Sequence, residues 1–210
     1  MLGIAMALWL GCFVLVRTRG SWGAFAVVGV VLVAFAIATD ARARALLRWS
    51  WATAAIGLAV GIAMVLLTHG AFQVVSRLLP IAEQATWRLF GLLDVAGFAP
   101  LERGGLIVVI AACEEVIFRG ALLGPPATGE HGVVQPLHRN DVLRVLGFAA
   151  AYALATATLG SWLLILCAFC CGVLWGVVRV ATRSLVAPIV CHVSWDLGVL
   201  VLWPVVLAGT

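Results

Sequence analysis

Long apolar runs, separated by short polar segments, fill most of the chain. A helix needs about 20 apolar residues to cross roughly 30 Å of hydrocarbon. The alternation of polar and apolar residues that is typical of a membrane barrel is absent, and helices satisfy their own backbone hydrogen bonds in lipid. The pattern therefore predicts an all-α, polytopic transmembrane helical bundle of about seven spans (range roughly five to eight), over residues 1–16, 21–39, 49–68, 106–123, 142–159, 162–180 and 185–207.

Between the third and fourth runs, residues 69–103 mix charged residues with apolar residues at roughly helical spacing. This spacing predicts amphipathic helices that lie at the membrane interface or close a cavity. The clearest loop extends from residue 124 to residue 139, because Pro and Gly gather there. No internal repeat or soluble segment divides the chain, so residues 1–210 are expected to form a single membrane domain.

Composition excludes several classes of protein. Of 210 residues, 64% are apolar and 10% are charged, whereas soluble domains average about 45–50% and 25%. A soluble enzyme, a nucleic-acid-binding module and a disulfide-rich secreted domain are therefore set aside. The six cysteines all lie in apolar runs, where a thiol usually packs as a small hydrophobic group, so no disulfide framework is expected.

All 13 basic residues are arginines, and the formal net charge is +4. In a membrane chain this charge suits loops near anionic lipid headgroups, so the bilayer rather than nucleic acid is the expected partner. Arginines are more frequent in the connections after the second, fourth and sixth spans, which favours these connections as cytoplasmic. They carry Arg42, Arg44, Arg48, Arg139, Arg144, Arg179 and Arg183.

Charged residues inside the fourth span are the first candidates for chemistry. Glu114, Glu115 and Arg119 lie in an otherwise apolar helix, where charges are costly and normally face a protein interior or a water-filled cavity. Glu115 and Arg119 are four residues apart in the sequence and can pair along one helix face. Glu114 points about 100° away from this face, so the Arg119 cation compensates its negative charge less. Its carboxylate is therefore available as a general base. A structural ion pair that locks two helices is the alternative.

The last span carries the second group of candidates. His192 and Asp196 are also four residues apart, so one helix face presents an imidazole together with a carboxylate that orients the ring and fixes its tautomer. The alternative is a buried histidine that its neighbour satisfies without any chemistry. Two such groups in separate spans of one small chain predict a polar pocket inside the membrane.

The pattern Glu-Glu-x-x-x-Arg followed by His-x-x-x-Asp resembles the CPBP family of intramembrane proteases, which includes type II CAAX prenyl proteases and bacteriocin-processing proteins. The resemblance covers a core of residues 104–207. It implies that Glu114 activates water and that Glu115 and Arg119 support it. It also implies that His192 and Asp196 stabilise the oxyanion or a bound ion.

The chain departs from the family pattern in the intervening helix. The family usually has Phe-x-x-x-His there, whereas this chain has no histidine between residues 141 and 191. Tyr152 and Thr156 match by spacing; either hydroxyl can donate to an oxyanion, but neither is a good zinc ligand. A glutamate-and-water mechanism, which requires no cofactor, is therefore favoured. A divalent metal such as zinc is the less favoured alternative, with Glu114, His192 and Asp196 as its ligands.

These features predict an intramembrane endopeptidase of the bacterial inner membrane. Its expected partner is a peptide or protein terminus that enters from the bilayer, such as a leader, a lipidated C-terminus or a sorting tail. The alternatives are a CPBP-like peptide-binding, immunity or scaffold protein that has lost catalysis, a thiol-dependent processing enzyme that uses Cys113 or Cys191, and a transporter.

Overall fold

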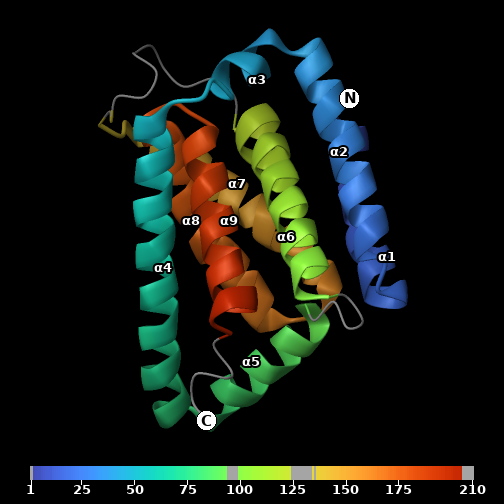
Figure 1. The fold of residues 1–210 in the computed structure, drawn as a ribbon, viewed down its shortest axis with the longest axis vertical. Coiled ribbons are helices and arrows are strands. Elements are labelled where there is room, and N and C mark those ends of the chain that lie inside the picture. Colours follow the sequence, from blue (N-terminus) through green and yellow to red (C-terminus); the bar gives the residue numbers. More distant parts are fainter. Residues whose placement is uncertain (1, 94–98, 124–133, 135, 205–210) are drawn as a thin grey trace.

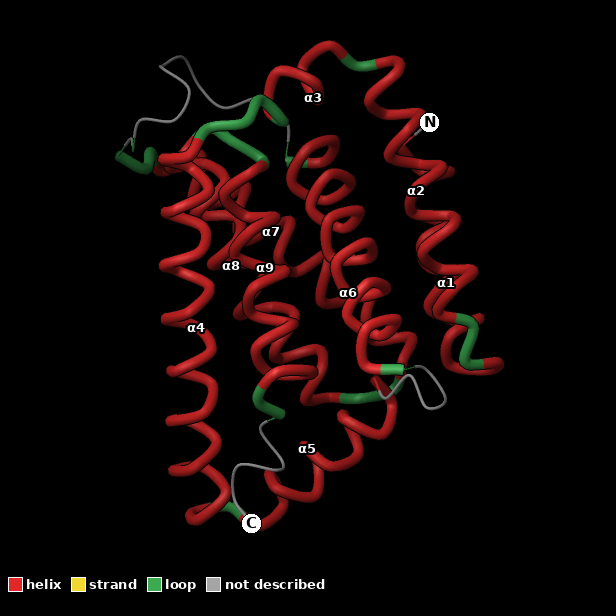
Figure 2. Tube along the Cα trace, viewed as in Figure 1, coloured by secondary structure: helices red, strands yellow, loops and turns green. Residues whose placement is uncertain are grey.

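The apolar runs of the chain fold as helices, as hydrocarbon requires of a backbone that must satisfy its own hydrogen bonds. The computed structural model describes residues 2–93, 99–123, 134 and 136–204. These residues form helices, turns and loops, and no strand occurs among them (Figure 2). Most of the long helices follow a common direction (Figure 1). The expected all-α fold is therefore confirmed.

The elements follow one another along the chain as α1 (Leu2–Arg19), α2 (Trp22–Thr39), α3 (Ala41–Leu46), α4 (Trp51–Leu78), α5 (Pro80–Leu93), α6 (Pro100–Glu114), η1 (Glu115–Leu122), α7 (Arg139–Thr156), η2 (Ala157–Leu159), α8 (Trp162–Thr182), α9 (Val186–Leu197) and η3 (Gly198–Leu202). Of the loop predicted over residues 124–139, residues 124–133 and 135 lie outside the described part of the chain, as do the last three residues of the predicted seventh span.

Within the described residues, four helical segments are long and apolar enough to cross a membrane: α2, α4, α7 together with η2, and α8. Large apolar side chains lie exposed on the outside of these helices, among them Val27 at 64% and Leu67 at 70%, as expected of a surface that lipid covers. The chain is therefore an integral membrane protein. The count of seven spans and the bacterial inner membrane stay predictions.

Helix α4 is longer than the sequence analysis predicts. It does not end near Thr68 but continues to Leu78 as one helix of 28 residues, about 42 Å long at 1.5 Å per residue. The helix stops where Leu79 adopts an extended conformation before Pro80, because a residue that precedes proline disfavours the helical conformation. Residues 69–78, which include Arg77, therefore extend α4, and the next helix begins at Pro80.

Helix α5 crosses one end of the bundle at an angle to the long helices (Figure 1). One of its faces, which includes Ala82, Leu89 and Phe90, lines an internal cavity, while Trp87 and Arg88 lie on its exposed face. Helix α5 therefore has an amphipathic pattern, as predicted, and its apolar face lines the cavity.

Small residues allow α4 and α9 to pack closely. Gly57 and Gly61 of α4 face the backbone of α9, where a Cβ at Gly61 would lie 2.8 Å from the carbonyl oxygen of Cys191. Such close backbone approach is the usual way in which helices associate in lipid. It also determines the position of the residue after Cys191, which is His192.

Replacing Gly61 by alanine is expected to push α9 away from α4, because the new methyl group would meet both the Cys191 carbonyl and the Ser194 Cβ at 2.8 Å. The expected cost is about 1–3 kcal/mol, measured as a lower Tm in detergent. Gly70→Ala on the same helix is the matched control, since a Cβ there has nothing within 4 Å. Equal melting temperatures for the two variants would contradict this packing.

The sequence analysis assigns Arg179 and Arg183 to the connection after the sixth span, but the structure buries both side chains. Arg179 lies in the last turn of α8 with 1% of its surface exposed, and Arg183, directly after α8, is 6% exposed. Helix α8 ends because Arg183 adopts a left-handed conformation (φ 54°). By contrast, Arg42 and Arg44 on α3 are exposed as predicted.

Candidate active site

Three helices carry the predicted polar residues into the middle of the bundle. Glu114 ends α6 and Glu115 begins η1. In η1 the turn widens, and the backbone N–H of Leu123 donates to the carbonyl of Phe118, five residues earlier, at 3.2 Å. Wide turns of this kind are frequent at functional sites. The sequence analysis did not predict this change of helix geometry.

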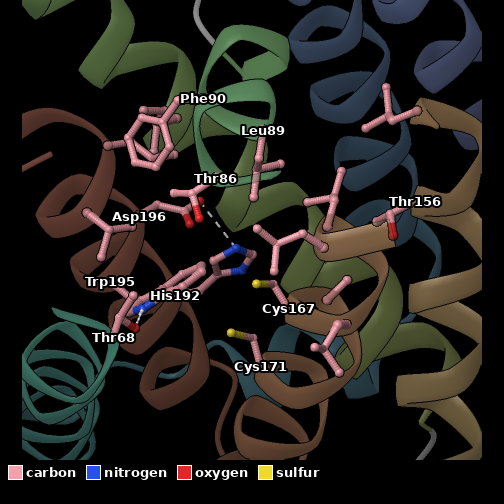
Figure 3. A pocket seen from close by; sticks show the side chains of 18 of the residues that line it. Thr68, Thr86, Leu89, Phe90, Thr156, Cys167, Cys171, His192, Trp195 and Asp196 are labelled. Atoms are coloured by element: carbon pink, nitrogen blue, oxygen red, sulfur yellow. Dashed lines mark hydrogen bonds and ion pairs between the residues drawn. The ribbon is translucent and has the colours of Figure 1, made fainter. Parts of the chain in front are cut away.

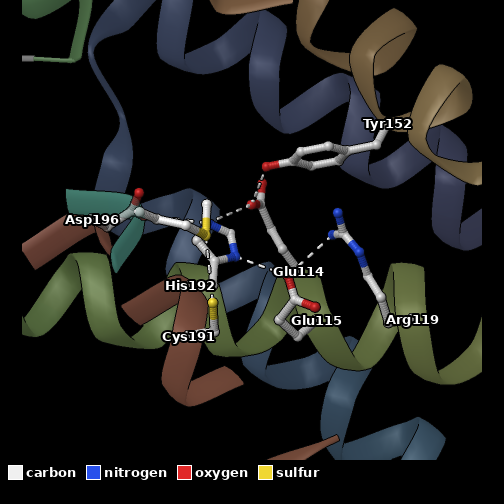
Figure 4. Close-up of polar contacts among 8 residues, drawn as sticks. Glu114, Glu115, Arg119, Tyr152, Cys191, His192 and Asp196 are labelled. Atoms are coloured by element: carbon white, nitrogen blue, oxygen red, sulfur yellow. Dashed lines mark hydrogen bonds and ion pairs between the residues drawn. The ribbon is translucent and has the colours of Figure 1, made fainter. Parts of the chain in front are cut away.

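The two adjacent glutamates enter different surroundings, as the helical spacing predicts. Glu114 Oε2 accepts a hydrogen bond from the Tyr152 hydroxyl at 2.7 Å. Glu115 Oε1 lies 3.1 Å from Arg119 Nη1 and 2.9 Å from His192 Nδ1, and its side chain is fully buried. Figure 4 shows Tyr152 and Arg119 to the right of the two glutamates and His192 to their left.

His192 lies between carboxylates from two helices. Its Nδ1 faces Glu115 at 2.9 Å, while its Nε2 is 3.3 Å from Asp196 Oδ2 and 4.0 Å from Glu114 Oε2. The predicted pairing of His192 with Asp196 is therefore present. The contact between His192 and Glu115 joins residues 77 positions apart, and the sequence analysis missed it.

An aromatic residue that the sequence analysis did not single out supports this cluster. The indole of Trp175 on α8 stacks on the His192 ring, with ring centroids 3.5 Å apart and planes inclined by 20°. The Arg119 guanidinium lies 5.2 Å from the Trp175 ring and 4.7 Å from the Tyr152 ring, within the range of cation–π attraction. Trp175 therefore contacts both the imidazole and the cation that pair with Glu115.

Gly172, one helical turn before Trp175 on α8, leaves room for the guanidinium. A Cβ at this position would lie 3.3 Å from Arg119 Nη2. The absence of a side chain thus lets Arg119 approach the backbone of α8.

The two predicted polar groups open on one cavity of about 420 Å³. Glu114, Tyr152, His192 and Asp196 line it together with apolar side chains from several helices, and Figure 3 shows His192 and Asp196 at its wall. Glu115 and Arg119 lie behind this wall, with 0% and 4% of their side chains exposed. The expected convergence of both groups on one pocket is therefore confirmed as geometry.

Of the two hydroxyls considered for the intervening helix, only one contacts the acidic pair. Tyr152 binds Glu114 directly. Thr156 also lines the cavity, but its hydroxyl donates to the Ala153 carbonyl of its own helix at 2.8 Å. Tyr152 is therefore the donor that the structure brings to the site.

Metal and thiol chemistry receive less support from the geometry. No group of three or more His, Cys, Asp or Glu side chains within the described ranges is arranged to hold a metal ion, so we derive no step through a metal. All six cysteines are free thiols, as the expected lack of a disulfide framework requires. Cys113 and Cys191 are 4% and 0% exposed, which does not suit a nucleophile.

Comparison with known proteins adds one match. A family model described as type II CAAX prenyl endopeptidase, Rce1-like, matches residues 98–198, slightly less than half of the chain. The matched region contains every residue proposed for the site. These residues are Glu114, Glu115, Arg119, Tyr152, Thr156, His192 and Asp196. Neither the curated proteins nor the solved structures contain a significant match.

Proposed function

Because the match over residues 98–198 supports membership of the CPBP family of intramembrane proteases, we propose that the chain is an intramembrane endopeptidase in which Glu114 activates water. The observation that carries the proposal is the position of the Glu114 carboxylate. It lies at the wall of a cavity inside the membrane, bonded to Tyr152 and 4.0 Å from His192. A water molecule and a peptide carbonyl would enter from this cavity.

In the proposed reaction, Glu114 takes a proton from water while the water oxygen forms a bond to the carbonyl carbon of the peptide. The tetrahedral intermediate then collapses, and the bond between carbon and the amide nitrogen breaks. Glu114 returns its proton to the leaving amine. The hydroxyl proton of the intermediate also passes to the amine, so the products are one new carboxylate and one new ammonium group, and atoms and protons balance without a cofactor.

The neighbouring donors would stabilise the charge that develops on the carbonyl oxygen. The Tyr152 hydroxyl and the Nε2 side of His192 flank Glu114 in the cavity wall. In a site of low dielectric constant, such preorganised donors are worth more than in water. Glu115 would hold the His192 ring from behind through Nδ1, and Arg119 would hold Glu115 in place through their ion pair.

The surroundings of the site suit a substrate that arrives through the bilayer. Most side chains that line the cavity are apolar, including Leu89 and Phe90 of α5 and Leu163 and Leu164 of α8. We therefore propose a peptide or protein terminus with an apolar segment, such as a leader, a lipidated C-terminus or a sorting tail.

The experiment that tests this proposal compares Glu114→Gln with Glu83→Gln in liposomes that contain a co-reconstituted candidate substrate. Glu83 lies on the exposed face of α5, so its loss of charge is the matched control. Cleavage that stops only in Glu114→Gln supports the proposal. Cleavage that continues undiminished in Glu114→Gln would remove Glu114 as the general base.

Replacing Trp175 by leucine is expected to lower kcat by about ten-fold or more with a smaller effect on KM, because His192 loses its stacking partner and the orientation of its ring. Trp175→Phe keeps an aromatic face and is expected to retain most of the activity. Steady-state kinetics of the two variants measure the effect. Equal kcat values for the leucine and phenylalanine variants would show that the stack does not position the imidazole.

A further inference from the structure

Arg179, in the last turn of α8, is a buried cation that the proposed reaction does not use. Its side chain is almost fully buried, and its Nε and Nη2 atoms have no hydrogen-bond partner among the residues that the structure describes. Among the ion pairs formed within the described ranges, none includes Arg179. An uncompensated charge inside a membrane protein is costly and usually marks a functional site.

A second arginine lies close to Arg179. Arg144, on the first turns of α7, is 38% exposed, and its guanidinium donates a hydrogen bond to the Leu123 carbonyl. The helices α7 and α8 are antiparallel neighbours, since a Cβ at Gly176 would lie 2.8 Å from Val145 Cγ1. The start of α7 and the end of α8 therefore bring both arginines to the same end of the bundle.

Among the described residues, the carboxylates nearest this end already have partners. Asp40, at the start of α3, accepts from the backbone N–H of Arg42 at 2.8 Å. Asp141 Oδ1 lies 3.8 Å from Arg144 Nη1, and its other oxygen accepts from the backbone N–H of His138 at 3.4 Å. Glu115 is occupied by Arg119 and His192. No carboxylate of the described residues pairs with Arg179, which leaves this cation available to an anion from outside the chain.

The surroundings of this bundle end favour a lipid as the source of the anion. The backbone N–H of Leu185, directly after α8, donates to the Leu46 carbonyl of α3 at 2.8 Å, which brings the exposed Arg42 and Arg44 to the same end. Figure 1 shows α3 at the opposite end from α5. The excess of arginines predicts that this end faces the cytoplasm, where anionic lipids are concentrated.

We propose that Arg179, assisted by Arg144, binds the phosphate group of an anionic lipid headgroup at the end of α7 and α8. Arg144 is the partly exposed residue that the headgroup meets first, and Arg179 is the buried residue that holds a phosphate oxygen. The guanidinium geometry suits a phosphate, because it presents two parallel N–H donors. This site is separate from the cavity that Glu114 and His192 line, since neither arginine lines that cavity.

The experiment measures Tm of the purified full-length protein in nanodiscs of phosphatidylcholine, with and without phosphatidylglycerol, for wild type, Arg179→Met and Arg42→Gln. In wild type and in the Arg42 control, phosphatidylglycerol is expected to raise Tm. In Arg179→Met this increase is expected to vanish, while Tm in pure phosphatidylcholine stays equal to or above wild type, because an uncompensated buried charge has been removed. A merely structural arginine would instead lower Tm in both lipids.

Two further measurements decide between the remaining outcomes. Native mass spectrometry of wild type is expected to show that phosphatidylglycerol is retained about ten-fold more strongly than phosphatidylcholine. Arg144→Gln is expected to weaken that preference. These two measurements test the proposal even if Arg179→Met does not fold. Equal retention of the two lipids would overturn the proposal. So would a full increase in Tm with inorganic phosphate alone, or an undiminished phosphatidylglycerol effect in Arg179→Met.

Discussion

Glutamine at position 114 is expected to slow peptide cleavage by about 10²–10⁴-fold, the usual contribution of a general base. The amide has nearly the same shape as the carboxylate, and its oxygen still accepts the Tyr152 hydrogen bond that Glu114 Oε2 accepts at 2.7 Å. Only the ability to take a proton from water is lost. Initial cleavage rates in liposomes, with Tm measured on the same preparation, separate this loss from unfolding.

The control for this prediction is a carboxylate that does not touch the cavity. Glu83→Gln removes one charge from the exposed face of α5 and should leave the rate within experimental error of wild type. A Glu114→Gln protein that folds normally and cleaves as fast as Glu83→Gln would contradict the proposed role of Glu114. Loss of cleavage in both variants would indicate an effect of net charge instead.

Replacing Arg119 by methionine is expected to destabilise the protein by about 3–5 kcal/mol, because the fully buried Glu115 carboxylate then loses its cation. The guanidinium also gives up its contacts with the Tyr152 and Trp175 rings. Cleavage activity should fall in parallel, since Glu115 also holds His192 Nδ1 at 2.9 Å. Unfolding in mixed detergent micelles measures the loss of stability.

A double variant distinguishes loss of the ion pair from loss of packing. Glu115→Gln combined with Arg119→Met leaves no isolated buried charge, so it should regain part of the stability that Arg119→Met loses. Arg88→Met, on the exposed face of α5, is the control for removing one arginine. If Arg119→Met unfolds under the same conditions as Arg88→Met, the buried pair makes no net contribution.

Local helix geometry explains why part of the site could be predicted. The pairs Glu115–Arg119 and His192–Asp196 are each four residues apart, and within a helix that spacing alone brings the side chains together. Both pairs are present, at 3.1 Å and 3.3 Å. The split between adjacent glutamates followed from the same rule.

The remaining contacts join residues that are distant in the sequence. Tyr152 binds a carboxylate 38 residues away, and His192 meets Glu115 across 77 residues. The spacing of residues along one helix does not indicate which face of another helix packs against them. For the same reason, the sequence does not distinguish Trp175 from the other apolar residues of its span. The packing of α8 against α9 stacks its ring on His192.

The amino-acid sequence alone determined that this chain is helical and lies in a membrane, because apolar runs in lipid have few other ways to satisfy their backbone. It also determined which residues pair within one helix. Only the tertiary structure decided that Glu114 and His192 line one cavity, that Glu115 lies behind its wall, and that Arg179 is buried. These outcomes depend on how closely the helices approach one another, as at Gly61 and Gly176, and that packing is a property of the whole bundle.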